Sequence, residues 1–238
     1  FLKNKYHKKV AKVALNANFT CPNRDGTISK GGCIYCSNSA SGDFGGNPNE
    51  DLLIQFEKGK ALMQSKWSDC GFIAYFQAGT NTYGDMAYLK ACFEPFVNHQ
   101  DVLGLAIATR PDCLNEEILD YLESINRRTH LTIELGLQTI HAKTAKLINR
   151  GHDLETFVQA VKNLRDRNID VCVHIINGLP FETADDMLET ARFISTLDIQ
   201  YLKIHMLFIL DNTPLYHYYQ QHPFPLLERE AFIDIVVK

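Results

Sequence analysis

Short apolar runs rich in β-branched residues alternate along the chain with segments in which the apolar residues have helical spacing. The segment from 154 to 164, for example, has apolar residues at i, i+3, i+4, i+7 and i+10, a pattern typical of a helix with one buried face. The runs that predict strands are Lys12–Ala17, Phe72–Gln77, Val102–Thr109, Leu131–Leu135, Val171–Ile176 and Tyr201–Leu207.

Two further helices are predicted from the residues that begin them. Asn115 precedes apolar residues at helical spacing, and Thr183 with Asp186 has the pattern of a capping box. The alternation of strands and helices indicates an α/β fold with right-handed crossovers and a parallel sheet. Six such units suit either a doubly wound sheet or a curved, partial (β/α)6 barrel. In both architectures the chemistry belongs at the carboxyl ends of the strands.

The size and charge of the chain narrow the choice of partners. With 238 residues it is long enough for one large domain. A net charge of −4 argues against a protein that coats nucleic acid through bulk charge. The first twelve residues are locally basic, which favours a solvated tail over a phosphate-binding arm. The lysines of this stretch are Lys3, Lys5, Lys8, Lys9 and Lys12.

Hydropathy and cysteine content indicate a cytoplasmic protein. Purely apolar runs, such as 206–210, reach five residues, whereas a membrane span needs about 20. No secretory leader opens the chain, and seven cysteines, an odd number, fit a reducing compartment better than a disulfide framework. The chain starts at Phe1 and stops within an amphipathic pattern. We therefore expect a single core domain over 1–238 that is cropped at both ends.

Three cysteines gather directly after the first predicted strand. Cys21, Cys33 and Cys36 have the spacing C-x11-C-x2-C, and three thiolates would leave one iron of a cubane cluster open to substrate. The alternative is a structural zinc site, but zinc needs four ligands and the sequence offers no second C-x2-C or H-x3-H pair. Isolated cysteines are usually small buried side chains, and we expect this of Cys70, Cys92, Cys113 and Cys172.

This cluster resembles the cysteine motif of the radical S-adenosylmethionine (radical SAM) superfamily, which also has an aromatic residue, here Tyr35, before the last cysteine. The commonest spacing in that superfamily is C-x3-C-x2-C. The longer first interval here resembles the branch that contains the catalytic subunit of Elongator and a group of uncharacterised bacterial proteins. The resemblance implies a [4Fe-4S] cluster on Cys21, Cys33 and Cys36, and a partial (β/α)6 TIM-like barrel of parallel strands.

Further motifs at strand ends extend the resemblance over nearly the whole chain. Gly79 and Thr80 follow the second strand and resemble the glycine-rich segment whose backbone contacts the methionine amine of S-adenosylmethionine (SAM). Gln138 and Arg150 have the spacing of a glutamine and an arginine that contact SAM in relatives such as oxygen-independent coproporphyrinogen oxidase. The arginine fork suits a carboxylate. A helix-end cation is the alternative role for Arg150.

Two other strand residues are candidate ribose contacts. Relatives have a glutamate where this chain has Ala108, so we expect Glu134 on the fourth strand to supply a carboxylate instead. His174 on the fifth strand stands where relatives often have aspartate, with a hydrogen-bonded core histidine as the alternative. We expect Arg110 and Asp112 to form a local salt bridge, with a ligand contact as the alternative. On the last strand, Lys203 and His205 point the same way, either lining a substrate cavity or, for Lys203, capping the strand end.

The resemblance also implies a mechanism. SAM would bind the open iron, a flavodoxin- or ferredoxin-type donor would supply one electron, and the resulting 5′-deoxyadenosyl radical would abstract hydrogen from substrate. The Elongator-like branch implies tRNA, through a wobble uridine, as the substrate class, with a small metabolite or peptide as the alternative. The contrasting hypothesis is a non-enzymatic α/β module with a structural zinc–cysteine site that binds RNA or a protein partner.

Overall fold

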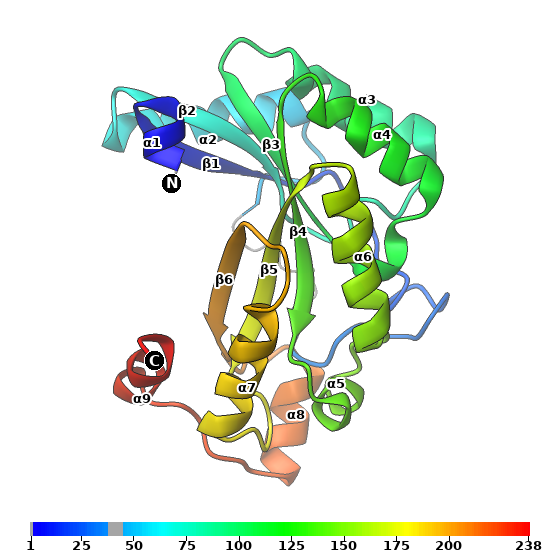
Figure 1. The fold of residues 1–238 in the computed structure, drawn as a ribbon, viewed down its shortest axis with the longest axis vertical. Coiled ribbons are helices and arrows are strands. Elements are labelled where there is room, and N and C mark those ends of the chain that lie inside the picture. Colours follow the sequence, from blue (N-terminus) through cyan, green and yellow to red (C-terminus); the bar gives the residue numbers. More distant parts are fainter. Residues whose placement is uncertain (1, 38–44) are drawn as a thin grey trace.

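The computed structural model describes residues 2–37 and 45–238. In these residues six strands form one parallel sheet in the order β1-β2-β3-β4-β5-β6, which curls into a half-barrel (Figure 1). A doubly wound sheet needs a reversal of strand order, and the sequential order here has none, so the partial barrel is confirmed. The strands are β1 (Lys9–Leu15), β2 (Cys70–Phe76), β3 (Val102–Thr109), β4 (His130–Gln138), β5 (Asp170–Asn177) and β6 (Tyr201–Met206).

Helices connect the strands and cover one face of the sheet (Figure 1). The predicted caps are confirmed: the Asn115 side chain accepts a hydrogen bond from Ile118 N, and Thr183 and Asp186 form a complete capping box. The helices are α1 (Leu2–Tyr6), α2 (Leu52–Lys66), α3 (Met86–Val97), η1 (Pro111–Cys113), α4 (Glu116–Asn126), α5 (Ala142–Leu147), α6 (Leu154–Asp166), α7 (Ala184–Ile194), α8 (Pro214–Gln221) and α9 (Arg229–Val236).

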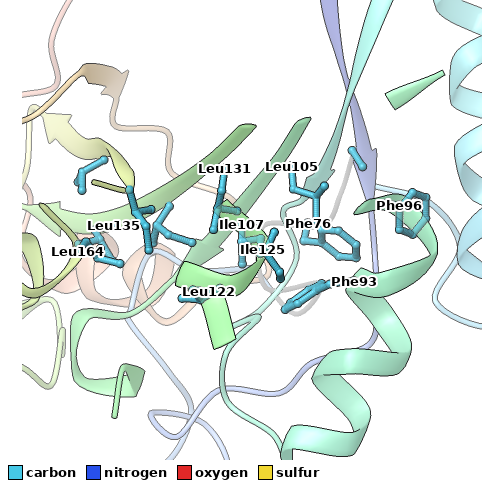
Figure 2. Close-up of a cluster of buried hydrophobic side chains, with 14 of the residues drawn as sticks. Phe76, Phe93, Phe96, Leu105, Ile107, Leu122, Ile125, Leu131, Leu135 and Leu164 are labelled. Carbon is cyan, nitrogen blue, oxygen red and sulfur yellow. The ribbon is translucent and has the colours of Figure 1, made fainter. Parts of the chain in front are cut away.

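The main hydrophobic core lies between the sheet and these helices (Figure 2). Successive residues of a strand face opposite sides, so alternate residues of β3 and β4 enter this core, among them Leu105, Ile107 and Leu131. Phe76 of β2 packs edge-on against Phe93 of α3, with ring centroids 4.7 Å apart. The intervening strand residues face the interior of the half-barrel, and this is where polar side chains gather.

The first strand begins earlier than its apolar pattern suggests. We expected Lys12–Ala17, but β1 spans Lys9–Leu15 because all seven of its residues pair in register with β2. The basic stretch is therefore not a solvated tail. The Lys9 ammonium lies 3.8 Å from the centroid of the Trp67 ring, and Lys12 forms an ion pair with Glu134. Since β1 starts at Lys9, the lysines before it lie at the amino ends of the strands.

Candidate active site

A cavity of about 470 Å³ opens at the carboxyl ends of the strands. Its walls come from the segment after β1 and from the ends of β2 to β6. This edge is where parallel sheets of α/β proteins place their ligands. The cavity brings together every residue that the sequence singled out for cluster or SAM binding: Cys21, Cys33, Tyr35, Cys36, Gly79, Thr80, Glu134, Gln138, Arg150 and His174.

The cysteine segment is held by tight turns. Arg24 N donates to Cys21 O over 2.8 Å, and Cys36 N donates to Cys33 O over 3.0 Å. Gly32 has φ +82°, and a Cβ there would lie 3.0 Å from atoms of the Arg24 side chain. Glycine at this position therefore both allows the left-handed backbone and lets Arg24 pass close to the chain.

Two side chains that the sequence did not single out donate to cysteine sulfurs. Arg24 Nη2 lies 3.2 Å from Cys36 Sγ, and Asn23 Nδ2 lies 3.6 Å from Cys33 Sγ. Burial, together with the neighbouring Cys36, raises the pKa of the Cys33 thiol to about 11. A buried thiol of this kind becomes a thiolate when a metal supplies positive charge. The donor set of three cysteine thiols facing one cavity, with hydrogen-bond donors aimed at two of the sulfurs, fits an iron–sulfur cluster.

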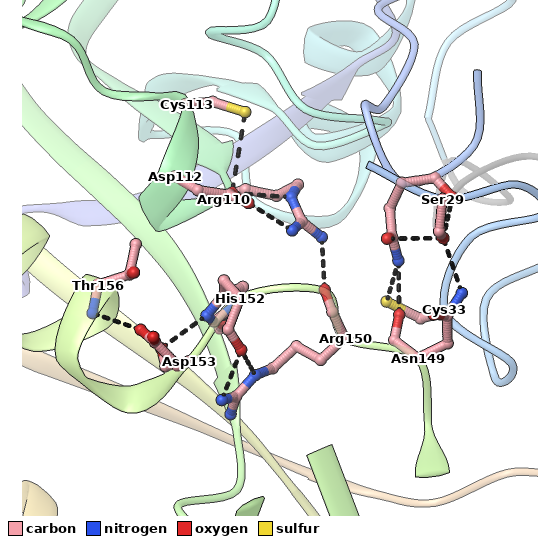
Figure 3. Close-up of polar contacts among 12 residues, drawn as sticks. Ser29, Cys33, Arg110, Asp112, Cys113, Asn149, Arg150, His152, Asp153 and Thr156 are labelled. Carbon is pink, nitrogen blue, oxygen red and sulfur yellow. Dashed lines mark hydrogen bonds and ion pairs between the residues drawn. The ribbon is translucent and has the colours of Figure 1, made fainter. Parts of the chain in front are cut away.

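Asn149 anchors the long loop between the first two cysteines (Figure 3). Its Nδ2 donates to Ser29 Oγ over 2.9 Å and to Gly32 O over 2.8 Å, while its carbonyl accepts from Asn23 Nδ2 over 2.5 Å. Asn149 adopts φ +54°, a left-handed conformation that asparagine tolerates better than most residues. The loop is thus fixed to the segment between α5 and α6, more than a hundred residues away in the sequence.

The two buried arginines of the cavity are held by protein groups (Figure 3). Arg110 donates to both carboxylate oxygens of Asp112, over 2.9 and 2.7 Å, which confirms the predicted local salt bridge. Arg150 donates four hydrogen bonds to the carbonyls of Leu137, Thr139 and His152. A guanidinium has five N–H donors, so backbone carbonyls accept from four of the five donors of Arg150.

Two of the SAM-binding candidates, Gly79 after β2 and Gln138 at the end of β4, have unusual backbone conformations. Gly79 has φ +77°, and a Cβ there would lie 2.2 Å from Phe19 O, so only glycine fits. Gln138 has φ +66° and sits where the β4–β5 register shifts. Non-glycine residues at positive φ cluster at ligand sites, where surrounding structure holds the strain. Both residues line the cavity at or just after the end of a strand.

A buried carboxylate organises the interior of the half-barrel. Glu134 Oε2 lies 2.6 Å from His174 Nε2, and Glu134 Oε1 forms an ion pair with Lys12 of β1. Burial opposes ionisation of Glu134, but the hydrogen bond from His174 and the Lys12 ammonium outweigh it and hold the pKa of the carboxyl well below its usual range. Glu134 is therefore a carboxylate with partners from two other strands, and His174 is a hydrogen-bonded residue that also faces the cavity.

Lys203 and His205 both line the cavity, which decides between the two roles left open for them. The Lys203 ammonium lies 3.4 Å from the Tyr75 hydroxyl and 5.3 Å from the centroid of that ring. The rings of His205 and His174 have centroids 5.4 Å apart. Burial, together with the charges of His174 and Lys203, lowers the pKa of His205 to about 4, so this imidazole is neutral at pH 7.

Among the described residues, no helix is both long and apolar enough to cross a bilayer.

The chain was compared with protein families and with known proteins. The family model named "Radical SAM superfamily" matches residues 21–194. The chain is 48% identical over 235 residues to the uncharacterized protein YtqA of Bacillus subtilis, covering 99% of this chain and 73% of that protein. It is 26% identical over 137 residues to the tRNA uridine(34) acetyltransferase of Methanocaldococcus infernus, covering 56% of this chain and 25% of that protein.

Solved structures agree with the fold. The archaeal Elp3 of Methanocaldococcus infernus superimposes with a TM-score of 0.70 at 18% identity, covering 96% of this chain and 53% of that one. Coproporphyrinogen III oxidase (HemN) from Escherichia coli superimposes with a TM-score of 0.61 at 15% identity, covering 97% of this chain and 51% of that one. This chain thus spans about half the length of both structures. It belongs to the radical SAM superfamily of enzymes. Membership of this superfamily implies a [4Fe-4S] cluster and SAM as cofactors.

Proposed function

We propose that this protein cleaves SAM reductively at a [4Fe-4S] cluster held by Cys21, Cys33 and Cys36, and acts on a substrate bound in the same cavity. The observation that supports this proposal is the convergence of the three thiols and the SAM-binding candidates on one cavity at the carboxyl ends of the strands. When bound, the cluster and SAM would supply one-electron cleavage of SAM and hydrogen abstraction from the substrate.

The protein residues bind and orient the reactants. We assign the methionine amine of SAM to the backbone of Gly79 and Thr80, and its carboxylate to Gln138 and the remaining N–H of Arg150. Tyr35 packs against the apolar cluster of Ile148, Ile176 and Leu179 and lines the cavity together with the cysteines. Glu134 and His174 face the interior and offer oxygen and nitrogen atoms to the ribose hydroxyls. The support for these roles is that each of these residues lines the cavity.

We propose a tRNA, modified at a uridine, as the substrate. The support is the similarity to a protein named tRNA uridine(34) acetyltransferase, which covers 56% of this chain. That match covers 25% of the relative, so its acetyltransferase activity is not transferred to this chain. The basic stretch before β1 lies at the amino ends of the strands and the cavity at the carboxyl ends, so this proposal does not rest on that stretch. A flavodoxin- or ferredoxin-type protein is the proposed electron donor.

The proposal is tested with anaerobically reconstituted protein, SAM and a one-electron reductant. We expect 5′-deoxyadenosine to accumulate, and to accumulate faster when unmodified tRNA is added. The variant Cys33→Ala is expected to form none, while Cys92→Ala, which changes a buried cysteine of the core, is expected to match the wild type. Absence of 5′-deoxyadenosine from a protein that holds its cluster would refute the reaction. An unaltered rate of 5′-deoxyadenosine formation with tRNA would refute only the proposal that tRNA is the substrate.

A further inference from the structure

Strand β6 presents two polar side chains to the cavity and an apolar one to the opposite side. Lys203 and His205 line the cavity, whereas Leu202, which is also on β6, is 41% exposed. Side chains two residues apart on a strand share a face, so the two polar groups form a pair. Ile176, Met206 and Leu207 also line this cavity. The ammonium group of Lys203 therefore shares a partly apolar cavity, where charge is screened less than in bulk water.

The carboxylate of the cavity does not neutralise Lys203. Glu134 is the acidic side chain among the described lining residues, and both of its oxygens have partners, Lys12 and His174. Lys203 Nζ donates a hydrogen bond to the Tyr75 hydroxyl over 3.4 Å. An ammonium has three N–H donors, so two donors of Lys203 remain for a ligand.

The surrounding groups suit an anion. His205 is neutral at pH 7, because burial and the neighbouring Lys203 and His174 lower its pKa to about 4, and a neutral imidazole has one N–H donor. Lys12 lies 5.0 Å and Lys203 5.3 Å from the centroid of the Tyr75 ring, one ammonium from β1 and one from β6. Because Glu134 balances only one of these ammonium groups, the inner cavity keeps an excess of positive charge.

We propose that Lys203 and His205 form a subsite for an anionic group of the substrate, a carboxylate or a phosphate. This inference rests on the proposed function and names the chemistry that the substrate carries near its reacting position. The residues assigned to the methionine end of SAM come from the segment after β2, the end of β4 and the segment between α5 and α6, whereas the subsite lies on β6. SAM also has a carboxylate, so the experiment has to separate the two sources of negative charge.

Binding is measured with two probes, inorganic phosphate and ¹³C-acetate, by NMR line broadening on protein that holds the oxidised cluster and SAM. Lys203→Met is the test variant, and Lys203→Arg restores the charge. Lys162→Met removes an exposed lysine on α6 as a matched control. Iron content and cluster absorbance establish that each variant is folded. We expect Lys203→Met to bind at least one probe roughly 10- to 150-fold more weakly, the range for lost hydrogen bonds to a charged group.

Lys203→Arg and Lys162→Met are expected to stay within a few-fold of the wild type, and Lys203→Met is expected to bind SAM normally. Equal probe binding by the wild type and Lys203→Met would overturn the subsite, as would an absence of binding by either. A loss of SAM affinity in Lys203→Met, matching the loss of probe affinity, would assign Lys203 to SAM and also overturn it. Failure of the proposed function has a different signature: Lys203-dependent probe binding in a protein that forms no 5′-deoxyadenosine.

Discussion

Arg24 Nη2 lies 3.2 Å from the sulfur of Cys36, the last cysteine of the motif. The arginine comes from the eleven-residue interval that separates Cys21 from Cys33. This interval is longer than the commonest spacing of the superfamily, and part of its length is used to place a cation beside a predicted cluster ligand. Hydrogen bonds to cluster sulfurs are one of the factors that set reduction potential.

The first prediction follows from this contact. Replacing Arg24 with Gln removes a positive charge that stabilises the more negative, reduced cluster, so the reduction potential should fall. A loss of about 1.4 kcal/mol of differential stabilisation corresponds to about 60 mV for one electron. The reduction potential of Arg24→Lys, which keeps the charge, should fall less. EPR-monitored redox titration of the reconstituted proteins measures both, and equal potentials for wild type and Arg24→Gln would contradict the assigned contact.

The second prediction separates the SAM contact of Gln138 from its structural effect. Gln138→Gly removes the side chain at a position with φ +66°, which glycine adopts without strain. The free energy of unfolding should therefore change by less than about 1 kcal/mol, while SAM binds roughly 10- to 150-fold more weakly, the range for one hydrogen bond to a charged group, here the SAM carboxylate. Urea unfolding and SAM titration measure the two effects. An unchanged SAM dissociation constant would remove Gln138 from the site.

The third prediction concerns the buried guanidinium of Arg150. Arg150→Met should lower the free energy of unfolding by about 2–5 kcal/mol, because the carbonyls of Thr139 and His152 lose their donors. Arg150→Lys should recover part of this loss, since one ammonium cannot reach all the carbonyls. Urea unfolding of the proteins without cluster gives the values. A loss below about 0.5 kcal/mol in Arg150→Met would show that the hydrogen bonds are replaced by water.

The fourth prediction is a pH dependence of stability. The pKa of His205 is lowered to about 4 in the folded protein by burial, His174 and Lys203, whereas it is near 6.5 when unfolded. Between these values the unfolded state binds more protons, so stability should fall as the pH is lowered from 6.5 to 4. Since the ring is partly exposed, the slope should be below about 1.4 kcal/mol per pH unit.

Glu134 on β4 also faces this histidine, and its lowered pKa contributes stability that is lost only below the normal glutamate range. Between pH 5 and 6.5 the change in the free energy of unfolding therefore comes mainly from histidines. Urea unfolding at pH 7 and pH 5 should show a smaller difference for His205→Gln than for the wild type. The exposed His217→Gln is the control. The same difference in all three proteins would mean that His205 is not the titrating group.

Features set by nearby residues could be predicted from the sequence. The capping box at Thr183 depends on a residue three positions away, and the helix over 154–164 depends on its own periodicity; both are present in the structure. The strand alternation predicted the units of the barrel but not its curvature, because local pattern carries no information on strand order. The resemblance to radical SAM proteins, and not periodicity, favoured the sequential half-barrel.

Features set by distant residues were missed or misinterpreted. Lys12 looked like part of a basic tail, because its partner Glu134 lies 122 residues away. The role of Asn149 was not predicted for the same reason: its amide contacts are 117 and 120 residues away. An alternating strand pattern starting at Lys9, with buried Ala11, Val13 and Leu15, was the available signal that these lysines belong to a strand.

The iron content of single cysteine variants tests the central claim most directly. After anaerobic reconstitution, the wild type should contain about four irons per chain and absorb broadly near 400 nm. Cys21→Ala, Cys33→Ala and Cys36→Ala should each lose most of this iron. Cys113→Ala is the strictest control, because Cys113 is near Cys21 yet lines a different pocket, and it should retain the wild-type content. Full iron in any variant of the trio, or its loss in Cys113→Ala, would contradict the assignment.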